Sequence, residues 1–451
     1  MQFPPDVDDY CEALTELGRA MVDDGSRVSD ERAEILVDSG YTYFGQFIAH
    51  DLTKDLSSVD DAWRKEPEEV ENLQTPKLDL STLYGGGPES SPELYEEDGV
   101  RLKIGHQGNG RDSFDIHVRA NGACVLADER NTENLILRQM TAVFARLHNF
   151  AVEQFRAKIV DKRDLLERAR RQTQWQYQWL VCRDYLPTLL DRVVYNELFV
   201  QGRPRIHWQV FSIPVEFSAA AMRFGHAMVR PNYLFAFGQE MKLAQILCRT
   251  TRVGAVAPEH QINWGFFFQG AGRVNSVTAR PIDTRLAPPF QHLPNDLIGV
   301  APVTCPHVRV AKNPPALAVR TLLRGAGLRL ASGQSVARAL GEPPLSEEEL
   351  TTNSERAETQ QGCILRNHSL TRETPLWYYI LKESEVRHNG NRVGPVGSRV
   401  VAETIYAALR SDPDSLLNRG SAANSPPVWR FPHGRIRLYG LSEFFRAAPL
   451  F

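Results

Sequence analysis

The stretch that most constrains this chain is residues 43–51 (YFGQFIAHD), which are mostly apolar but carry a glutamine, a histidine and an aspartate within six residues. In an α-helix, Gln46 and His50 lie four residues apart and share a face. Asp51 then points about 100° away from His50. One short helix could therefore direct an imidazole into a pocket and a carboxylate away from it. A lone histidine on an apolar helix more often satisfies a backbone carbonyl, so the assignment depends on the rest of the sequence.

The overall composition excludes several classes of function. The 451 residues have a net charge of −3, which offers no basic field for nucleic acid or an anionic membrane. No apolar run approaches the length of a membrane span. Residues 1–25 are acidic and amphipathic and lack the basic and apolar regions of a signal peptide, so we expect a cytoplasmic protein, with secretion by a leaderless route left open. The six cysteines are scattered without a CxxC pair and are expected to be free, buried thiols.

The periodicity of apolar residues predicts a mainly α protein with little β-structure, folded as one large helical domain over residues 1–451. Helices are expected at 8–23, 31–39, about 133–158, 162–185, 217–229, 315–340, 375–386 and 396–410. Asn131 or Asp128 would cap the helix over 133–158, and Pro187 would end the next one.

The segments outside these helices are expected to form a hairpin, a surface loop and a tail. Residues 100–125 would form a hairpin, residues 56–74 a surface loop, and residues 425–451 a tail that wraps the surface. Residues 75–88 (TPKLDLSTLYGGGP) place oxygen-bearing side chains at alternate positions before a glycine turn. In an extended segment, the side chains of residues 75, 77, 79 and 81 would lie on one side.

Six short segments occur in a fixed order along the chain. They are residues 45–51 (GQFIAHD), 79–85 (DLSTLYG), 130–133 (RNTE), 148–149 (HN), 183–187 (RDYLP) and 223–226 (RFGH). In this order they resemble the animal-type haem peroxidases, the peroxidase–cyclooxygenase superfamily that includes myeloperoxidase and lactoperoxidase. The resemblance runs from about residue 40 to about residue 410. The sequence shows no leader, disulfide framework or pro-segment, and in this it resembles a bacterial member of the family more than a secreted animal one.

The resemblance implies a role for three residues around hydrogen peroxide. His50 matches the distal histidine, and a neutral imidazole can take a proton from one peroxide oxygen and deliver it to the other. Arg130 matches the distal arginine, whose permanent charge stabilises negative charge as the O–O bond breaks. Gln46 matches the distal glutamine, which holds water or small anions above the iron, although simple helix packing also explains it.

The resemblance also implies the residues that hold the haem. His226 matches the proximal ligand of the haem iron, although a lone histidine on an apolar helix is usually structural. Gly225 would let the backbone approach the macrocycle, and Arg223 would pair with a haem propionate. Cyclooxygenases and fatty-acid dioxygenases place a radical-forming tyrosine where this chain has Arg223, which disfavours a tyrosyl-radical oxygenase.

A calcium site is implied as well. Two carboxylates with hydroxyl and carbonyl oxygens are hard ligands suited to Ca²⁺. The alternative is an Asx or ST turn that binds nothing. The positions that match the family's calcium ligands are Asp51, Thr75, Lys77 through its carbonyl, Asp79 and Ser81.

Several positions depart from the family pattern. Glu133 matches one of two acids that form haem esters in mammalian members, but Ala49 stands at the other. Asn134 replaces a methionine that bonds a haem vinyl in myeloperoxidase. We therefore expect haem b, non-covalent or held by at most one ester through Glu133. Thr321 stands where the family usually has an asparagine that accepts the N–H of the proximal His226, so we expect a threonine hydroxyl in that role.

The sequence thus predicts a haem peroxidase that reduces H₂O₂ and oxidises an organic donor or a halide through an oxyferryl intermediate. The expected partners are H₂O₂ and that small donor, with no nucleic acid and no membrane span. Two alternatives stay open. One is a haem-dependent oxygenase acting on a fatty acid or natural product, and the other is a non-catalytic haem-binding protein.

Overall fold

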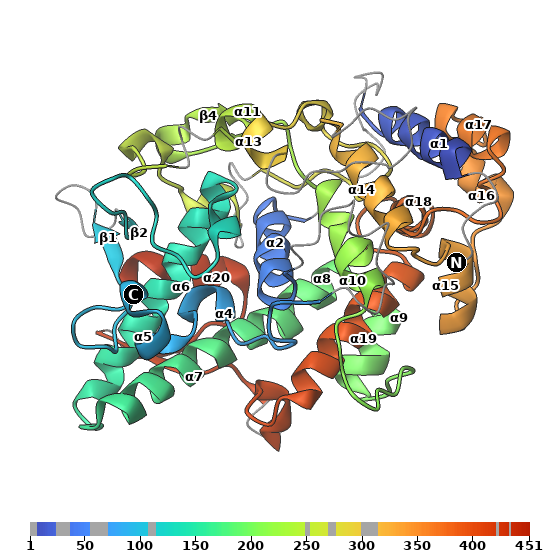
Figure 1. The fold of residues 1–451 in the computed structure, drawn as a ribbon. Helices are drawn as coiled ribbons and strands as arrows, with labels where there is room; N and C mark the ends of the chain where they lie inside the picture. The colour runs from blue at the N-terminus through green and yellow to red at the C-terminus, as the bar shows by residue number, and fades with distance from the viewer. Residues whose placement is uncertain are drawn as a thin grey trace.

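The computed structural model describes residues 7–23, 37–54, 71–106, 114–248, 253–268, 277–298, 314–420, 424–432 and 434–451. Helices dominate these residues, which confirms the mainly α prediction (Figure 1). The helices are α1 Val7–Ala20, α2 Gly40–Leu52, α4 Ser81–Tyr84, α5 Gly87–Ser90, α6 Leu135–Arg156, α7 Lys162–Leu180, α8 Leu186–Leu189, α9 Arg192–Tyr195, α10 Val215–Ala219, α11 Leu243–Ile246, α13 Asn295–Ile298, α14 Leu317–Gly327, α15 Gly333–Leu340, α16 Glu347–Thr351, α17 Gln360–Asn367, α18 Leu376–His388, α19 Pro395–Ser411 and α20 Leu441–Ala447.

The strands of the described residues form three separate antiparallel pairs. These are β1 Ile104–His106 with β2 Phe114–Ile116, β3 Asn232–Leu234 with β4 Glu240–Lys242, and β5 Val428–Phe431 with β6 Gly434–Arg437. The first pair confirms the predicted hairpin within residues 100–125. None of the described helices combines the length and apolar composition needed to cross a lipid bilayer.

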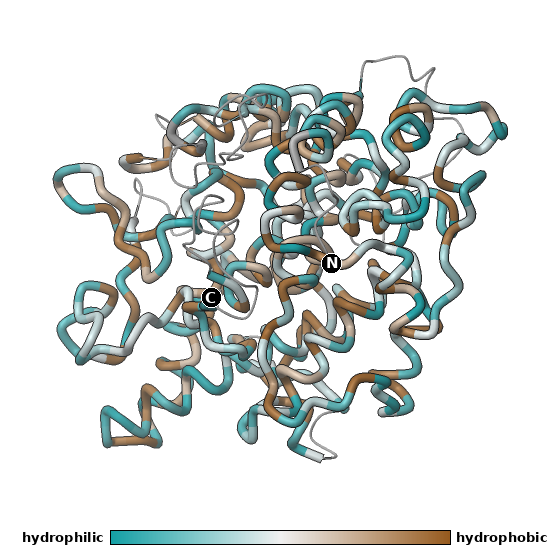
Figure 2. The backbone as a smooth tube through the Cα atoms, turned by 45° about the vertical axis from the view of Figure 1, so that its right-hand side comes forward, coloured by the Kyte–Doolittle hydropathy of each residue, from teal (hydrophilic) through white to brown (hydrophobic). Residues whose placement is uncertain are grey.

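Helix α2 lies in the middle of the molecule and packs against α6, α4 and two 3₁₀ segments, η3 (Glu129–Thr132) and η6 (Ala221–His226) (Figure 1). Hydrophobic and hydrophilic residues alternate along most helices, as expected for helices with one buried face (Figure 2). Behind α2, Phe47 stacks on Phe144 of α6 with ring centroids 4.9 Å apart, and Tyr177 of α7 meets Phe47 edge-on at 5.8 Å. These aromatic contacts fix α2 against the α6–α7 pair.

Two predicted helix boundaries are wrong. Helix α6 is capped by Asn134, whose side chain accepts from the N–H of Leu137, whereas Asp128 caps η3 instead. Pro187 does not end the second long helix. The chain continues from α7 through a π-helical turn at Val181–Tyr185 into α8, where the proline occupies the first turn and its missing N–H costs nothing.

The predicted apolar helix over residues 217–229 is also divided. Ala220 leaves the helical region with φ −132° and ψ −66°, so α10 ends at Ala219 and a separate 3₁₀ segment carries Arg223 and His226. Two other expectations, the helix at 31–39 and the loop at 56–74, fall largely outside the described residues.

The C-terminal segment is not a tail that wraps the surface. Trp429 of β5 and Phe444 and Phe445 of α20 are fully buried, and Phe444 packs on Phe144 with centroids 5.0 Å apart. The free thiols are not all buried either, because Cys363 is exposed. The last segment of the chain therefore completes the aromatic core behind α2.

Candidate active site

Helix α2 places Gln46 and His50 on one face, as its period predicts. The His50 side chain is buried, and its Nδ1 lies 2.9 Å from Oδ1 of Asn131. Because an amide oxygen only accepts hydrogen bonds, Nδ1 carries the imidazole proton and Nε2 keeps its lone pair. Burial, reinforced by the positive charge of Arg130, lowers the pKa of His50 to about 3. His50 is therefore a neutral imidazole at pH 7 whose Nε2 can accept a proton.

A hydrogen-bonded chain holds Gln46 beside His50. Nε2 of Gln46 donates to Oε2 of Glu133 at 3.0 Å, and Nδ2 of Asn134 donates to Oε1 of Gln46 at 3.0 Å. The same Glu133 oxygen lies 3.7 Å from Nε2 of His50. The structure thus brings together three of the predicted residues, Gln46, His50 and Glu133, and adds Asn134 as the group that orients the glutamine amide.

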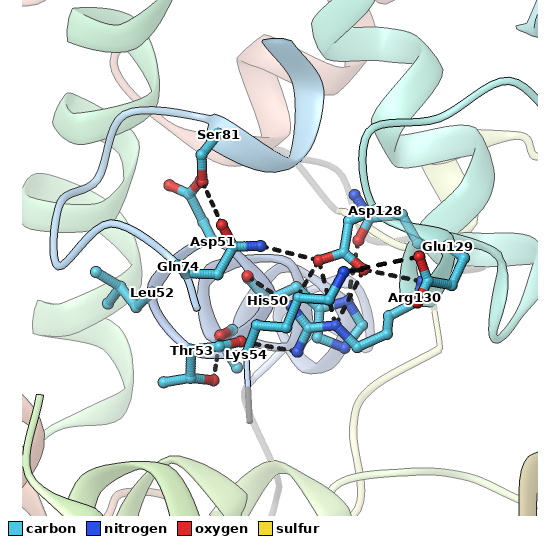
Figure 3. Close-up of polar contacts among 12 residues, drawn as sticks. His50, Asp51, Leu52, Thr53, Lys54, Gln74, Ser81, Asp128, Glu129 and Arg130 are labelled. Carbon is cyan, nitrogen blue, oxygen red and sulfur yellow. Dashed lines mark hydrogen bonds and ion pairs between the residues drawn. The ribbon is translucent and has the colours of Figure 1, made fainter. Parts of the chain in front are cut away.

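Arg130 points its guanidinium at the end of α2 and at Asp128 (Figure 3). Its Nη2 donates to Oδ2 of Asp128 at 2.7 Å and to the backbone carbonyl of His50 at 3.0 Å. Its Nη1 donates to the carbonyl of Thr53 at 2.7 Å, and its Nε lies 3.0 Å from Oδ1 of Asp128. Lys54 adds a second cation 3.7 Å from the same carboxylate.

These contacts have a clear physical cause. The last carbonyls of an α-helix lack intrahelical partners and carry a partial negative charge, so a cation at this end is favourable. Arg130 supplies that cation to the last turn of α2. The guanidinium of Arg130 contacts Asp128 and the backbone carbonyls of His50 and Thr53. Its predicted role, the stabilisation of negative charge on peroxide, stays a prediction.

His226 lies on η6 and is held from one side by Trp377. The two rings meet edge-on with centroids 5.9 Å apart, and the indole N–H donates to the carbonyl of Arg223 at 3.1 Å. Nε of Arg223 in turn donates to the carbonyl of Ser218 at 3.0 Å. Helix α18 thereby fixes the short 3₁₀ segment whose own hydrogen bonds are too few to hold it.

The predicted hydrogen bond between Thr321 and His226 is wrong. Oγ1 of Thr321 donates to the carbonyl of Leu317, four residues earlier on α14, at 2.9 Å. Threonine hydroxyls often make this bond within a helix. Nδ1 of His226 is buried and has no hydrogen-bond partner in the described part of the chain.

The surroundings of His226 fit an axial ligand of a haem iron. A Cβ added to Gly225 would meet no atom within 4 Å, so open space adjoins the backbone beside the histidine. Burial, reinforced by the charge of Arg223, lowers the pKa of His226 to about 3 and keeps the imidazole neutral, as metal ligation requires. The segment η6 also packs against α2, so the elements that carry His50 and His226 are neighbours.

The oxygen-rich loop is bent rather than extended, because Leu80 adopts a left-handed conformation (φ 58°) immediately before α4. The bend nevertheless gathers the predicted side chains. Asp51 accepts from the N–H of Leu80 at 3.1 Å and from Oγ of Ser81 at 3.4 Å. Asp79 accepts from the N–H of Ser81 at 3.0 Å and from Oγ1 of Thr75 at 3.1 Å.

The carboxylates of Asp51, on α2, and Asp79, in the loop, lie in surroundings that disfavour their charged form. Burial raises the pKa of Asp51 well above its usual range, and the neighbouring Asp79 raises it further. Burial likewise raises the pKa of Asp79. No cluster of three or more His, Cys, Asp or Glu side chains suited to a metal occurs among the described residues, so any cation here would need hydroxyl and carbonyl oxygens as well.

Helix α7 clamps the same loop through its backbone. Nε2 of Gln174 donates to the carbonyl of Asp79 at 2.6 Å, and Nε2 of Gln178 donates to that of Leu78 at 2.8 Å. The side chain of Lys77 is engaged elsewhere, since its Nζ lies 3.4 Å from Oδ1 of Asp412. Only the carbonyl of Lys77 is left for the role predicted from the sequence.

Sequence reasoning missed three residues that build the site, namely Asp128, Asn131 and Trp377. Asn131 belongs to the recognised segment 130–133 and Asp128 stands two residues before it, so a signal was present. The hydrogen bond between Asn131 and His50 depends on the packing of η3 against α2, which the local sequence does not specify. Trp377 lies 151 positions after His226 in the numbering, and nothing local marks it as its partner.

The chain matches known proteins in sequence and in fold. The sequence profile of the family described as animal haem peroxidase matches residues 56–300. The peroxidasin homolog pxn-2 of Caenorhabditis elegans is 28% identical over 190 residues, which cover 38% of this chain and 14% of that protein. The chain therefore spans only a small part of the length of this curated relative.

Solved structures share the fold over nearly the whole chain. Peroxidase A from Dictyostelium discoideum matches with a TM-score of 0.61 and 14% identity, over 90% of this chain and 85% of that one. The fatty acid alpha-dioxygenase of Arabidopsis thaliana matches with a TM-score of 0.62 and 12% identity, over 93% of this chain and 73% of that one. The fatty acid alpha-dioxygenase of Oryza sativa matches with a TM-score of 0.62 and 13% identity, over 90% of this chain and 74% of that one. These solved structures confirm the helical fold, and the match to the animal haem peroxidase profile confirms the superfamily expected from the motifs.

Proposed function

Because the chain belongs to the animal haem peroxidase family, we propose that it is a haem peroxidase that reduces H₂O₂ and oxidises an organic donor or a halide. The family implies a haem and oxidoreductase chemistry. The finer assignment rests on one observation, the buried, neutral His50 whose Nδ1 is held by Asn131 and whose Nε2 keeps its lone pair.

His226 would hold the haem iron, and Arg223 would approach a propionate. Bound haem supplies the redox centre at which peroxide is reduced. The protein supplies proton transfer, since Nε2 of His50 takes a proton from one peroxide oxygen and returns it to the departing oxygen. Asn131 keeps the imidazole in the tautomer that can do this. The positive charge of Arg130, which already depresses the pKa of His50, would favour the charge that develops as the O–O bond breaks.

The test is the rate at which hydrogen peroxide changes the haem absorption spectrum. His50→Ala should lower this second-order rate by about 10²- to 10⁴-fold, the usual contribution of a positioned acid–base group. His148→Gln is the matched control, because His148 is a buried histidine that bonds Tyr84 and the carbonyl of Val100. Equal rates in the wild type and His50→Ala would refute the proposal.

The proximal assignment has its own experiment. His226→Ala should lose the haem absorption band or retain haem only weakly, whereas His148→Gln should keep it. Undiminished haem binding in His226→Ala would contradict the assignment. Acidified acetone should extract most of the haem, because Ala49 cannot form an ester and Glu133 is already engaged with Gln46.

We further propose that Ca²⁺ binds between Asp51 and Asp79, with oxygens from Thr75, Ser81 and the carbonyl of Lys77. The support is the pair of carboxylates whose pKa values are raised by burial, an arrangement that a cation would stabilise. Wild-type protein should bind about one Ca²⁺ and should melt at a lower temperature in a chelator. Asp79→Asn should remove both effects, and retention of both would contradict the site.

Oxygenation is the competing outcome, since the fold is shared with proteins described as fatty acid alpha-dioxygenases. The presence of Arg223 three residues before His226 favours the peroxidase. Turnover under isotopically labelled O₂ separates the two, because a peroxidase leaves no label in the oxidised donor.

A further inference from the structure

A cavity lies away from α2, where the end of α6 and the middle of α7 meet the C-terminal hairpin. It has a volume of about 510 Å³ and is lined by residues of α6, α7, the segment after α19 and strands β5 and β6. The walls are tied together by Nε2 of Gln172, which donates to the carbonyl of Val428 at 3.1 Å, and by the N–H of Arg430, which donates to Oε1 of Gln154 at 3.2 Å. The cavity is therefore a built feature of the fold and not a gap between mobile loops.

The lining is strongly cationic, although the whole protein carries a net charge of −3. Six side chains in the lining are basic, and no lining residue is acidic. Within the described part of the chain, no ion pair joins any of the six to a carboxylate. These residues are Lys158, Arg168, Arg419, Arg430, Arg435 and Arg437. Such a concentration of one sign of charge attracts counter-ions into a concave site.

Part of this charge is preorganised. The guanidinium of Arg419 lies 3.4 Å from the ring centroid of Trp175, and that of Arg168 lies 5.9 Å from the same ring. Nη1 of Arg437 donates to Oγ of Ser425 at 2.9 Å. Stacked and hydrogen-bonded arginines lose less conformational freedom on binding a ligand than free ones do.

Two further observations favour an anionic ligand. Burial and the nearby cations Arg168 and Arg171 lower the pKa of Arg419, so negative charge beside this guanidinium would be favourable. The amide nitrogen of Gln154 is buried and has no acceptor among the described residues. A ligand rich in negatively charged oxygens would satisfy both.

We propose that this cavity binds a small polyanion that carries two or more phosphate or carboxylate groups. The size of the cavity matches a small molecule, and guanidinium groups bind both kinds of anionic group with paired hydrogen bonds. The guanidinium of Arg419 already stacks on the ring of Trp175, so the site offers charged groups for anionic oxygens. No residue of α2, η3 or η6 contributes, so this site is separate from the candidate active site.

Calorimetric titration of the full-length protein with inorganic pyrophosphate and, separately, with citrate tests the proposal. At least one should bind, and which one binds identifies the preferred anionic group. Arg435→Gln should weaken binding about tenfold or more, as expected for the loss of one charge-assisted contact. Arg435 is exposed on β6, so the substitution should leave folding intact. Arg419→Gln should have a similar effect.

Arg119→Gln is the matched control, since Arg119 is also exposed but does not line the cavity, and it should change the affinity less than twofold. Any fluorescence change caused by the ligand should vanish in Trp175→Phe, which retains an aromatic ring for the stacked arginines. The proposal is overturned if neither anion binds, if only a long polyanion such as heparin binds, or if Arg119→Gln weakens binding as much as Arg435→Gln.

Discussion

Replacing Asp128 by asparagine should destabilise the end of α2 and slow the reaction with peroxide. The carboxylate is 1% exposed and accepts from the guanidinium and the N–H of Arg130, and Nε2 of Gln74 donates to it at 2.9 Å (Figure 3). Asparagine keeps the shape and one acceptor but removes the charge. Arg130, with 20% of its side chain exposed, would then keep a largely buried charge without its counter-ion.

Breaking a buried ion pair on one side typically costs about 3–5 kcal/mol of unfolding free energy. We expect a value in that range for Asp128→Asn. The Arg130 guanidinium holds the pKa of Asp128 below its usual range, so the folded state favours the ionised acid. This contribution is fully present above the unfolded pKa of about 3.9 and is lost as the pH falls through the folded pKa. The difference between wild type and Asp128→Asn should therefore shrink below about pH 4.

Urea denaturation at several pH values measures this difference, and stopped-flow mixing with peroxide measures the functional effect. Asp98→Asn is the control, because Asp98 also accepts from an arginine and two backbone N–H groups, but its partner Arg101 is 46% exposed. That change should cost no more than about 1 kcal/mol. If Asp128→Asn is as mild as the control, or leaves the peroxide rate unchanged, the coupling of Arg130 to His50 through α2 is refuted.

Three other predictions concern buried groups elsewhere in the fold. In Gly45→Ala, the new Cβ would lie 2.2 Å from the buried hydroxyl of Tyr185, so stability in urea should fall by about 1–3 kcal/mol, whereas a gain from helix propensity would contradict the contact. Burial lowers the pKa of His148 to about 4 in the folded protein, against about 6.5 in the unfolded chain. Between pH 7 and pH 4, the free energy of unfolding of the wild type should therefore fall by about 3 kcal/mol relative to that of His148→Gln. If the difference in unfolding free energy between the two proteins stays constant with pH, the pKa of His148 is normal. Arg138→Met should cost about 3–5 kcal/mol, because it removes the cation that pairs with the buried Asp115. Asp115→Leu added to it should restore much of the loss, and no restoration would contradict a cost that comes from the remaining charge.

The helix that carries the proposed acid–base group could be predicted from local sequence. The period of residues 43–51 placed Gln46 and His50 on one face, and the structure does the same. The partners of these side chains could not be predicted in this way. Asn131 is adjacent to Arg130 in the chain, but its bond to His50 depends on how η3 packs against α2.

The errors at Pro187 and Ala220 have different causes. Proline stops a helix only where its missing N–H is needed, and the π-helical turn before α8 removes that need. Ala220 belongs to an apolar run with good helical periodicity, yet it leaves the helical region with φ −132° and ψ −66°. Hydrophobic periodicity and helix propensity describe only the local sequence, so they could not predict the continuation past Pro187 or the break at Ala220.

The position of α20 has a consequence for how the protein is made. Phe444 and Phe445 complete the aromatic packing of Phe144, which itself stacks on Phe47 of α2. A ribosome that adds about 5–20 residues per second needs roughly 20–80 s to pass from α2 to α20. During that time Phe47 and Phe144 lack the packing that Phe444 and Phe445 provide in the finished protein. The wall of the nascent protein that carries His50 therefore reaches its final packing late in synthesis, and until then it is a surface for chaperones or for aggregation.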